Sequence, residues 1–416
     1  MKKVVITGMG AITPLGNTVA EFNAALFTGK SGTAPITRFD AAKFKTRFAC
    51  EVKDFNALAY LDKTEQRKTD LYVQYAIAAA TQAMQQGGID EKNIDVTRAG
   101  VIIGTADGGS SSYLQQVTAF ATSDGVPAFS PHFIAMMMAN AAPATISMRY
   151  GFKGMNYATV AACASSHIAI IDAVNQLRWG KADIMLAGGA EANIIATSLG
   201  GFQSMRALST NSENAATASR PFDAARDGFV LGEGAAIFLL ETEAHALQRG
   251  AKILAQITGT AITSDAHHIA APHPQGDGAA RAMQLALQDA GLQPTNIQYI
   301  NAHATSTPVG DLAEIAAIQT VFGNAPTHLK ISATKAATGH LLGAAGAIGL
   351  LATIHALHTQ QIPPIINTCI IDGAIPATMP IVIGSKAIPF AITNALCNSF
   401  GFGGHNATII CKNYEG

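Results

Sequence analysis

Charged residues are scarce in this chain. Only 13% of its 416 residues are Asp, Glu, Lys or Arg, and the formal net charge at pH 7 is −1. A chain so close to neutrality produces no general field toward nucleic acid or anionic lipid, so we expect neither as a partner. Hydrophobic residues, in contrast, make up 49% of the chain. That fraction predicts a large core together with an oligomer interface, and we expect a homodimer.

Cysteine is also sparse and has no pattern. The five Cys form no CxxC pair and no framework spacing, which argues against a disulfide scaffold and indicates free thiols in a reducing compartment. His132 and the pair His267-His268 have no partner at metal-ligand spacing, so no metal is expected. No apolar run of about 18 residues lacks polar interruption, and the first residues resemble a strand rather than a signal peptide. We therefore expect a cytoplasmic protein without a membrane span.

The glycine-rich start of the chain lacks a dinucleotide-binding fingerprint. Gly8 and Gly10 follow a buried strand, but the next glycine is Gly16, and Pro14 blocks the usual helix start. This spacing argues against the common nucleotide site of α/β proteins.

What the chain does contain is a repeated alternation of strands and helices. Apolar runs typical of buried strands alternate with segments of helical periodicity through residues 1–250 and again through 251–416. No linker rich in Pro, Gly or Ser separates the two ranges, so we predict two similar α/β halves fused through one core. The predicted elements include a helix over 63–86, a strand within 229–240 and a closing strand at 379–384.

Cys163 stands where one of these strands turns into a helix. Residues 155–160 have the pattern of a short buried strand, and apolar positions from 168 to 177 recur at helical spacing. A thiol at a helix N-terminus lies near the positive end of the peptide dipoles, which favours a reactive thiolate. The alternative is a buried structural cysteine, because free Cys is among the most buried residue types.

Two histidines and a glycine-rich loop favour the nucleophile. His303 follows a strand that ends at Ile300, and His340 follows a strand and a loop that contains Lys335. A third loop, residues 398–406, is rich in glycine. Each feature alone could be structural. Together they place a nucleophile, two imidazoles, an ammonium group and a glycine-rich loop at strand ends, where open α/β sheets bind ligands.

These stretches resemble the β-ketoacyl-[acyl-carrier-protein] synthases, condensing enzymes of the thiolase superfamily, and most of all their type II elongating members. The resemblance extends from residue 3 to residue 412. Its motifs are Ala162 to Ser165, Arg206 to Thr210, Ser219 to Asp223, Arg226 to Gly234, Asn301 to Asp311, Thr334-Lys335, Gly339 to Gly346, and Asn398 to Gly404. The family implies an α/β thiolase fold, with two pseudo-symmetric halves in a five-layered αβαβα arrangement.

The resemblance also implies a reaction. Cys163 would take an acyl group from acyl carrier protein, and a malonyl thioester would then lose CO₂ and attack it, giving a 3-oxoacyl-acyl carrier protein in fatty-acid elongation. Backbone N–H groups of Cys163 and Phe400 would form the oxyanion hole. His303 and His340 would donate hydrogen bonds to the developing enolate. No cofactor is expected beyond the phosphopantetheine that the carrier protein brings.

Further roles follow from the same resemblance. Lys335 and Glu314 would orient the histidines, and Phe400 would gate between the acyl and malonyl pockets. The other substrate contacts would be Thr305 and Thr307 beside the pantetheine, Phe133 at the acyl tunnel or dimer interface, and Gly401 and Gly403 in the moving loop. The carrier protein would dock on Lys63, Arg67, Lys68 and Arg206.

Four places depart from the family pattern. They are Gly349 where a Glu is usual, Asp107 where the acyl-tunnel wall is usually aliphatic, Ala270-Ala271 where Thr or Ser is common, and Pro127-Ala128 in place of a basic pair. A carboxylate is unfavourable beside a saturated chain unless it faces water. The alternative interpretation is a ketosynthase of a specialised type II polyketide- or polyene-like pathway with a modified acyl pocket. Drift in a fatty-acid enzyme would explain the same changes.

Two other classes fit the sequence less well. A thiolase shares the fold but needs a second cysteine in a Cys-x-Gly-Gly loop, where this chain has Phe400 to Gly404. A non-catalytic chain-length subunit would have lost the nucleophile, and Cys163 is present. The sequence therefore favours the condensing enzyme.

Overall fold

Ten strands joined by hydrogen bonds form the core of the molecule. The computed structural model describes residues 1–415 except 91, 93 and 325. The strands, in chain order, are β1 (Val4–Ile12), β4 (Ala99–Gly104), β5 (Asn156–Thr159), β6 (Ile184–Glu191), β7 (Gly234–Thr242), β8 (Ala255–Ser264), β9 (Tyr299–Asn301), β10 (Lys330–Ser332), β13 (Asn394–Gly401) and β14 (His405–Lys412). Two short pairs lie outside this series, β2 (Ala34–Pro35) with β3 (Phe48–Ala49) and β11 (Gln361–Ile362) with β12 (Ile388–Pro389).

The strand order repeats in the two halves of the chain. It is β5-β4-β6-β7-β1 in the N-terminal half and β10-β9-β13-β14-β8 in the C-terminal half, which is the same order when each half is counted along the chain. In both halves the first two pairings of the series are parallel and the next two antiparallel. The halves meet where residues 4–6 pair with residues 255–257. This repeat confirms the expected pair of similar α/β halves.

Helices cover the sheets and also fill the space between them. They are α1 (Val19–Phe27), α2 (Lys63–Lys68), α3 (Leu71–Gly87), α4 (Ser110–Ala121), α5 (Phe133–Met137), α6 (Ala141–Tyr150), α7 (Ser165–Arg178), α8 (Ala196–Ser204), α9 (Glu243–Gln248), α10 (Asp277–Ala290), α11 (Pro308–Phe322), α12 (Lys335–Thr338) and α13 (Ala345–Thr359). Helix α3 covers β1, β6 and β7 from outside, and α10 covers β8 and β14.

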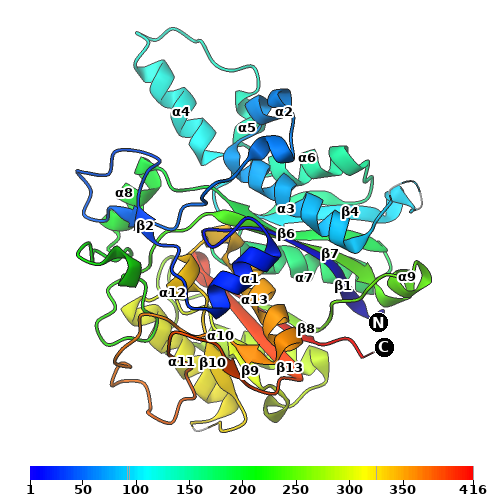
Figure 1. Cartoon of the computed structure of the whole chain (residues 1–416), viewed down its shortest axis with the longest axis vertical. Helices are drawn as coiled ribbons and strands as arrows, with labels where there is room; N and C mark the ends of the chain where they lie inside the picture. The colour runs from blue at the N-terminus through cyan, green and yellow to red at the C-terminus, as the bar shows by residue number, and fades with distance from the viewer. Residues whose placement is uncertain (91, 93, 325, 416) are drawn as a thin grey trace.

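Helices α7 and α13 form the middle layer (Figure 1). Helix α7 contacts β4 and β6 of one half and β8 and β14 of the other, and α13 contacts both β7 and β13. Nearly every residue of α13 is buried as a result. The segment Leu342–Thr359 is the one described stretch long and apolar enough to cross a membrane, and 83% of it is enclosed by the protein. The layers confirm the αβαβα arrangement of the thiolase fold.

Three predicted elements differ from the structure. The helix expected over 63–86 breaks before Asp70, which accepts the N–H of Tyr72 at 3.1 Å and so begins a new helix. The strand expected within 229–240 begins only at Gly234, because the residues before it bond to separate loops. Residues 379–384 make isolated bridges and no strand, since Pro380 offers no N–H to a ladder.

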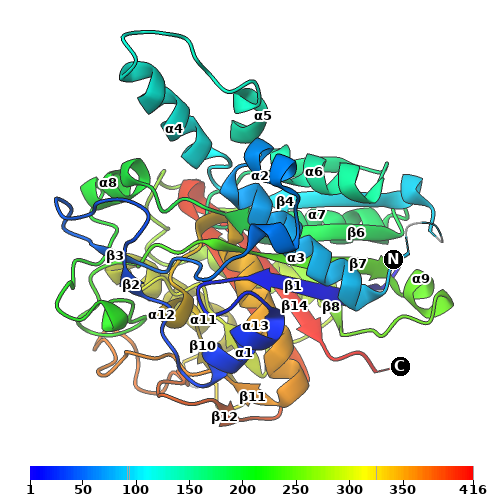
Figure 2. The same cartoon turned by 45° about the horizontal axis from the view of Figure 1, so that its top comes forward.

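An arm projects from the body of the molecule (Figure 2). It consists of α4, α5 and the loop between them, and its aromatic side chains stack in series, Phe120 on Phe129 at 5.3 Å and Phe129 on Phe133 at 5.7 Å between ring centroids. Large apolar side chains remain exposed on and beside it, among them Val117, Val126, Ile134, Met138, Met148 and Val160. Helix α6, which carries Met148, contacts β5, the edge strand of the N-terminal half, and Val160 directly follows that strand.

Candidate active site

Cys163 lies in the turn between β5 and α7, and its side chain is buried. The preceding residue, Ala162, has φ +47°, and the Ser165 hydroxyl donates to the Ala162 carbonyl at 2.7 Å. Gly104 at the end of β4 leaves no room for a side chain, because a Cβ there would collide with the backbone of Ser165. The turn that carries the thiol is therefore packed directly on the sheet.

The two predicted imidazoles come together beside this thiol. His340 Nε2 lies 3.0 Å from Cys163 Sγ. The His303 ring stands edge-on to the His340 ring with centroids 5.4 Å apart, and it lies 5.8 Å from the Phe400 ring. His303 follows β9, whereas His340 follows β10 and α12, so both imidazoles come from the C-terminal half and the thiol from the N-terminal half.

Burial dominates the electrostatics of the site. It raises the pKa of the Cys163 thiol to about 12, although the Lys335 ammonium and the backbone N–H groups of Phe402 and Cys163 oppose the rise. Burial also lowers the pKa of His303 and of His340 well below the usual range, and the charge of Lys335 lowers both further. The resting site therefore holds a neutral thiol. The helix dipole does not produce the expected thiolate, because α7 begins beyond Cys163 and desolvation outweighs it.

Glu314 holds the main chain of His303 rather than its ring. Its carboxylate accepts the N–H of His303 at 2.8 Å and the N–H of Ala304 at 2.7 Å. Among the described residues, neither His303 Nδ1 nor His340 Nδ1 has a hydrogen-bond partner. Lys335 is buried beside them and acts on both imidazoles through its charge. The two residues expected to orient the histidines thus lie next to them, but without a hydrogen bond to either ring.

The glycine-rich loop closes the site from the side of β13. A Cβ on Gly401 would lie 2.7 Å from the Ala161 carbonyl oxygen and 3.0 Å from the Cys163 nitrogen, so only glycine fits there. The backbone N–H groups at the sulfur are those of Cys163 and Phe402. Phe400, the expected donor, lies opposite Asn406 near the end of the β13–β14 ladder, and its role as an oxyanion donor stays a prediction.

Two residues that the sequence analysis missed connect the nucleophile to this loop. The Ser399 hydroxyl donates to the Cys163 carbonyl at 2.8 Å. His167, one turn after Cys163 on α7, places Nε2 3.2 Å from the Cys397 carbonyl oxygen. Burial lowers the pKa of His167 to about 3, so its ring is neutral. The four-residue spacing from Cys163 is the only sequence signal for His167.

An apolar cluster surrounds Cys163 on its other side. Its buried members are Ala49, Cys163, Ile194, Leu199, Leu208, Phe229, Leu231 and Leu342. Ala106 packs on this cluster, and the next residue, Asp107, is hydrogen-bonded to the amide of Asn193 at its border. Phe133 is not part of the cluster, because it lies on the arm.

The remaining predicted residues lie farther from the sulfur. The hydroxyl oxygens of Thr305 and Thr307 are 3.0 Å apart. Gly349 lies behind the site, where a Cβ would be 3.0 Å from Cys397 Sγ. In the part of the chain that the structure describes, no three His, Cys, Asp or Glu side chains gather as metal ligands. The expected docking residues are all exposed on α2 or just after α8, namely Lys63, Arg67, Lys68 and Arg206.

A buried thiol, two imidazoles and backbone N–H groups at one point define an enzyme that transfers acyl groups through a cysteine thioester. Family models for the N-terminal and C-terminal domains of beta-ketoacyl synthases match residues 1–246 and 254–369. The chain therefore belongs to the β-ketoacyl synthase family.

Relatives and solved structures match the chain along its full length. It is 43% identical over 414 residues to the 3-oxoacyl-[acyl-carrier-protein] synthase 2 of Synechocystis sp., covering 100% of this chain and 99% of the relative. The synthase of that name from Staphylococcus aureus strain N315 is 43% identical over 415 residues, with the same coverage. The ishigamide ketosynthase/chain length factor has a TM-score of 0.92 at 34% identity, and the ketosynthase complex AntDE:AntF has 0.90 at 31%, each covering 100% of both chains.

The high pKa of Cys163 predicts the pH dependence of its alkylation. Since only the thiolate reacts, the rate with iodoacetamide should rise about tenfold per pH unit from pH 7 to pH 9. Peptide mass spectrometry at Cys163 measures this rate, and the Cys163→Ala variant gives the background at the exposed Cys369. A plateau below pH 8 would reveal a stabilised thiolate and contradict the neutral resting site.

Proposed function

We propose that this enzyme joins an acyl group, held as a thioester on Cys163, to the two-carbon unit formed when a malonyl thioester loses CO₂. The observation that carries the proposal is the 3.0 Å contact between Cys163 Sγ and His340 Nε2, with His303 edge-on beside it. The names of the relatives, 3-oxoacyl-[acyl-carrier-protein] synthase 2, support carrier-protein thioesters as substrates and fatty-acid elongation as the pathway.

The first half-reaction loads the nucleophile. The Cys163 thiol passes its proton to His340 Nε2 as the sulfur attacks the acyl thioester. The carbonyl oxygen becomes an oxyanion, for which the N–H groups of Cys163 and Phe402 are the available donors. The bond between the acyl carbon and the pantetheine sulfur then breaks. The departing thiolate takes the proton back from His340, so the site is again neutral.

The second half-reaction forms the carbon–carbon bond. The bond from the malonyl methylene carbon to its carboxylate breaks, CO₂ leaves, and the electron pair forms an enolate. His340 leaves the first half-reaction with its proton on Nδ1, and in the tautomer with the proton on Nε2 it donates a hydrogen bond, together with His303, to the enolate oxygen without giving up the proton. The enolate carbon attacks the acyl-Cys163 carbonyl and the C–S bond breaks. Cys163 leaves as a thiolate and takes a proton from solvent.

The carrier protein and its pantetheine arm supply everything else that this reaction needs. Thr305 and Thr307 would flank the arm, and the exposed cations Lys63, Arg67, Lys68 and Arg206 would contact the carrier protein. One structural neighbour is described as a type II acyl carrier protein in complex with its ketosynthase, which supports this partnership. Phe400 would act as the gate, with Gly401 and Gly403 in its loop. The five cysteines are free, in agreement with the cytoplasmic location that we propose.

We further propose that two copies of this chain form a dimer through β5 and the arm. Strand β5 is a sheet edge with one side unpaired, and an unpaired edge beside apolar side chains is a ready interface. Met148 on α6, which packs beside β5, is 76% exposed, and Val160, directly after β5, is 59% exposed. A second copy would cover both, together with the apolar face of α4.

A second candidate function concerns the acyl chain. Asp107 and Asn193 form a hydrogen-bonded pair at the border of the apolar cluster around Cys163, and the Ser198 hydroxyl donates to the side-chain oxygen Oδ1 of Asn193 at 2.7 Å. Burial raises the pKa of Asp107, and none of the cations in the described part of the chain forms an ion pair with it. We infer that the acyl pocket accepts a chain with polar or unsaturated groups, as in a polyene-like pathway. The likeness to a ketosynthase whose structure is described as a type II PKS complex bound to the hexaketide supports this alternative.

Replacement of His303 should separate the two half-reactions. In His303→Ala, CO₂ release from malonyl carrier protein should fall by about 10²–10³-fold, because one donor to the enolate is lost. Acylation of Cys163, followed by intact-protein mass, should change by less than about threefold, since His340 remains. His358→Ala, at an exposed helix end, is the matched control. Equal loss of both steps in His303→Ala would contradict the assignment of His303.

A charge introduced beside β5 should weaken the proposed dimer. Light scattering should give twice the chain mass for the unmodified protein. Met148→Glu should weaken the dimer at least about tenfold, because a carboxylate would be buried without a partner. Ile370→Glu, which is 70% exposed on a loop of the other half, should leave the mass unchanged. A stable monomer of the unmodified protein would remove the proposal.

The polar border of the acyl pocket should control substrate choice. We expect polyene or hydroxylated acyl carriers to load Cys163 faster than saturated octanoyl carrier, and Asp107→Leu to invert this preference by about tenfold. Ser198→Ala, which removes only the support of Asn193, should shift it less in the same direction. If the unmodified enzyme loads saturated chains equally well, the specialised pocket is wrong and the fatty-acid interpretation stands alone.

A further inference from the structure

The turn that carries His303 and the two threonines has an unfavourable backbone. Ala304 has φ +24° and Ser306 has φ +69°, in the region that residues with a side chain rarely adopt. Such conformations persist only where the surroundings hold them, and they concentrate at functional sites. The contacts that hold residues 303–307 therefore decide where His303, Thr305 and Thr307 stand.

Two buried carboxylates of α11 hold this turn through its backbone. Glu314 accepts the N–H groups of residues 303 and 304, as described above. Asp311, three residues earlier on the same helix, accepts the N–H of Ser306 at 3.1 Å with one oxygen and the N–H of Phe222 at 2.8 Å with the other. Asp311 is completely buried, and burial raises its pKa to about 7. A buried carboxylate with this cost needs a cation beside it.

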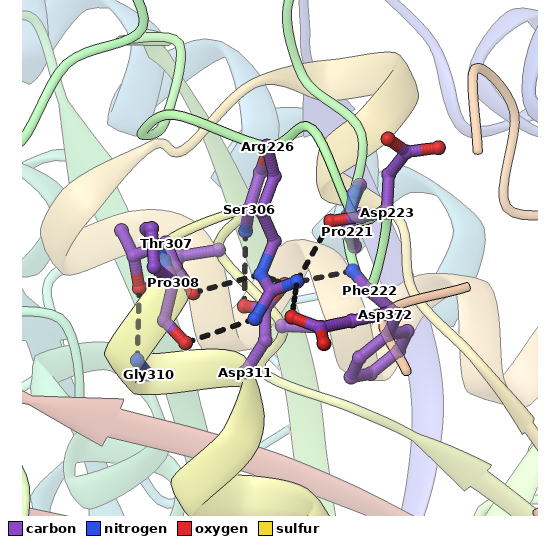
Figure 3. A network of polar contacts seen from close by, with 12 residues as sticks. Pro221, Phe222, Asp223, Arg226, Ser306, Thr307, Pro308, Gly310, Asp311 and Asp372 are labelled. Carbon is purple, nitrogen blue, oxygen red and sulfur yellow. Dashed lines mark hydrogen bonds and ion pairs between the residues drawn. The ribbon is translucent and has the colours of Figure 1, made fainter. Parts of the chain in front are cut away.

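Arg226 supplies that cation (Figure 3). Its Nε lies 3.3 Å from Asp311 and donates to the Thr307 carbonyl at 3.2 Å, and its Nη2 donates to the Pro308 carbonyl at 2.9 Å. On the far side its Nη1 donates to Asp372 at 2.8 Å. The side chain is 1% exposed and Asp311 is fully buried, so their contact is formed away from water, whereas Asp372 is 26% exposed. One guanidinium thus joins the end of the turn, the helix and the loop at Asp372.

The surroundings of the two threonine hydroxyls agree with a role in holding a ligand. Thr307 is the N-cap of α11, accepting the N–H of Gly310 at 3.2 Å, and its hydroxyl meets that of Thr305 at 3.0 Å. Gly310 faces both hydroxyls, and a Cβ there would lie 2.5 Å from Thr307 Oγ1. Arg226 binds the carbonyl oxygens on either side of this N-terminus, which fixes the hydroxyl pair without touching it.

We propose that Arg226 is a positioning residue that sets Thr305 and Thr307 for the pantetheine arm of the carrier protein. Arg226 touches neither the sulfur nor the imidazoles; it acts by holding the turn in its strained conformation. This inference rests on the proposed function. Its consequence is that loss of Arg226 harms only those substrates whose recognition uses the pantetheine arm.

The test compares two acyl donors on the same variant. Arg226→Lys keeps the charge but loses the planar fork that reaches several acceptors. With an acyl carrier protein as donor, the second-order rate of Cys163 acylation should fall about 10-fold, mostly through a higher KM, as two hydrogen bonds are misplaced. An acyl N-acetylcysteamine thioester lacks most of the arm. With this donor the rate should stay within about twofold of that of the unmodified enzyme, because Arg226→Lys weakens only the binding free energy contributed by the pantetheine arm.

Controls separate this role from a general loss of structure. Arg178→Lys is the matched variant, since Arg178 is 9% exposed and donates to Asp289 at 2.6 Å at the far end of α7. It should leave both donors unaffected. Asp372→Asn removes the negative charge from the outer contact of Arg226 and should give a smaller loss with the carrier protein alone, which keeps the test available if Arg226→Lys does not fold. Equal losses with both donors would overturn the proposal. Failure of the unmodified enzyme to acylate Cys163 from any carrier would instead refute the proposed function.

Discussion

The contact between Cys163 Sγ and His340 Nε2 joins the two halves of the chain, and the rest of the site depends on it. Cys163 follows β5, and His340 follows β10. Counted along the chain, each is the third of the five strands of its half. Because the two series have one topology, corresponding strand ends face the same point between them. Neither half alone has both a nucleophile and a base, so the catalytic unit is the fused pair.

Burial of the site determines the protonation states of Cys163, His303 and His340 as much as the identity of these residues does. A thiol and two imidazoles held away from water rest in their neutral forms, with Lys335 as the nearby charge. In the proposed mechanism the thiol gives up its proton only as the sulfur attacks a thioester carbonyl, so proton transfer is part of the reaction itself.

The sequence predicted the three central residues because each stands at a strand end in a motif with little freedom of spacing. Cys163, His303 and His340 could be placed at one pocket from topology alone. The choice between the N–H groups of Phe400 and Phe402 as oxyanion donor could not be made from the sequence, since it depends on where the β13–β14 hairpin ends relative to the sulfur. The prediction of a thiolate at Cys163 was wrong because the desolvation that raises its pKa depends on the tertiary packing around the residue, which the sequence does not show. The predicted strand at 379–384 was wrong because Pro380 interrupts an otherwise apolar run of residues.

The middle layer has a consequence for folding. Helices α7 and α13 each pack on strands of both halves, so separating the halves would expose the buried residues of both helices to water. The halves therefore cannot unfold one after the other without a large loss of buried surface, and we expect them to denature together. By the same coupling, we expect an acyl group bound on the side of Cys163 to stabilise the half that carries the histidines as well as its own.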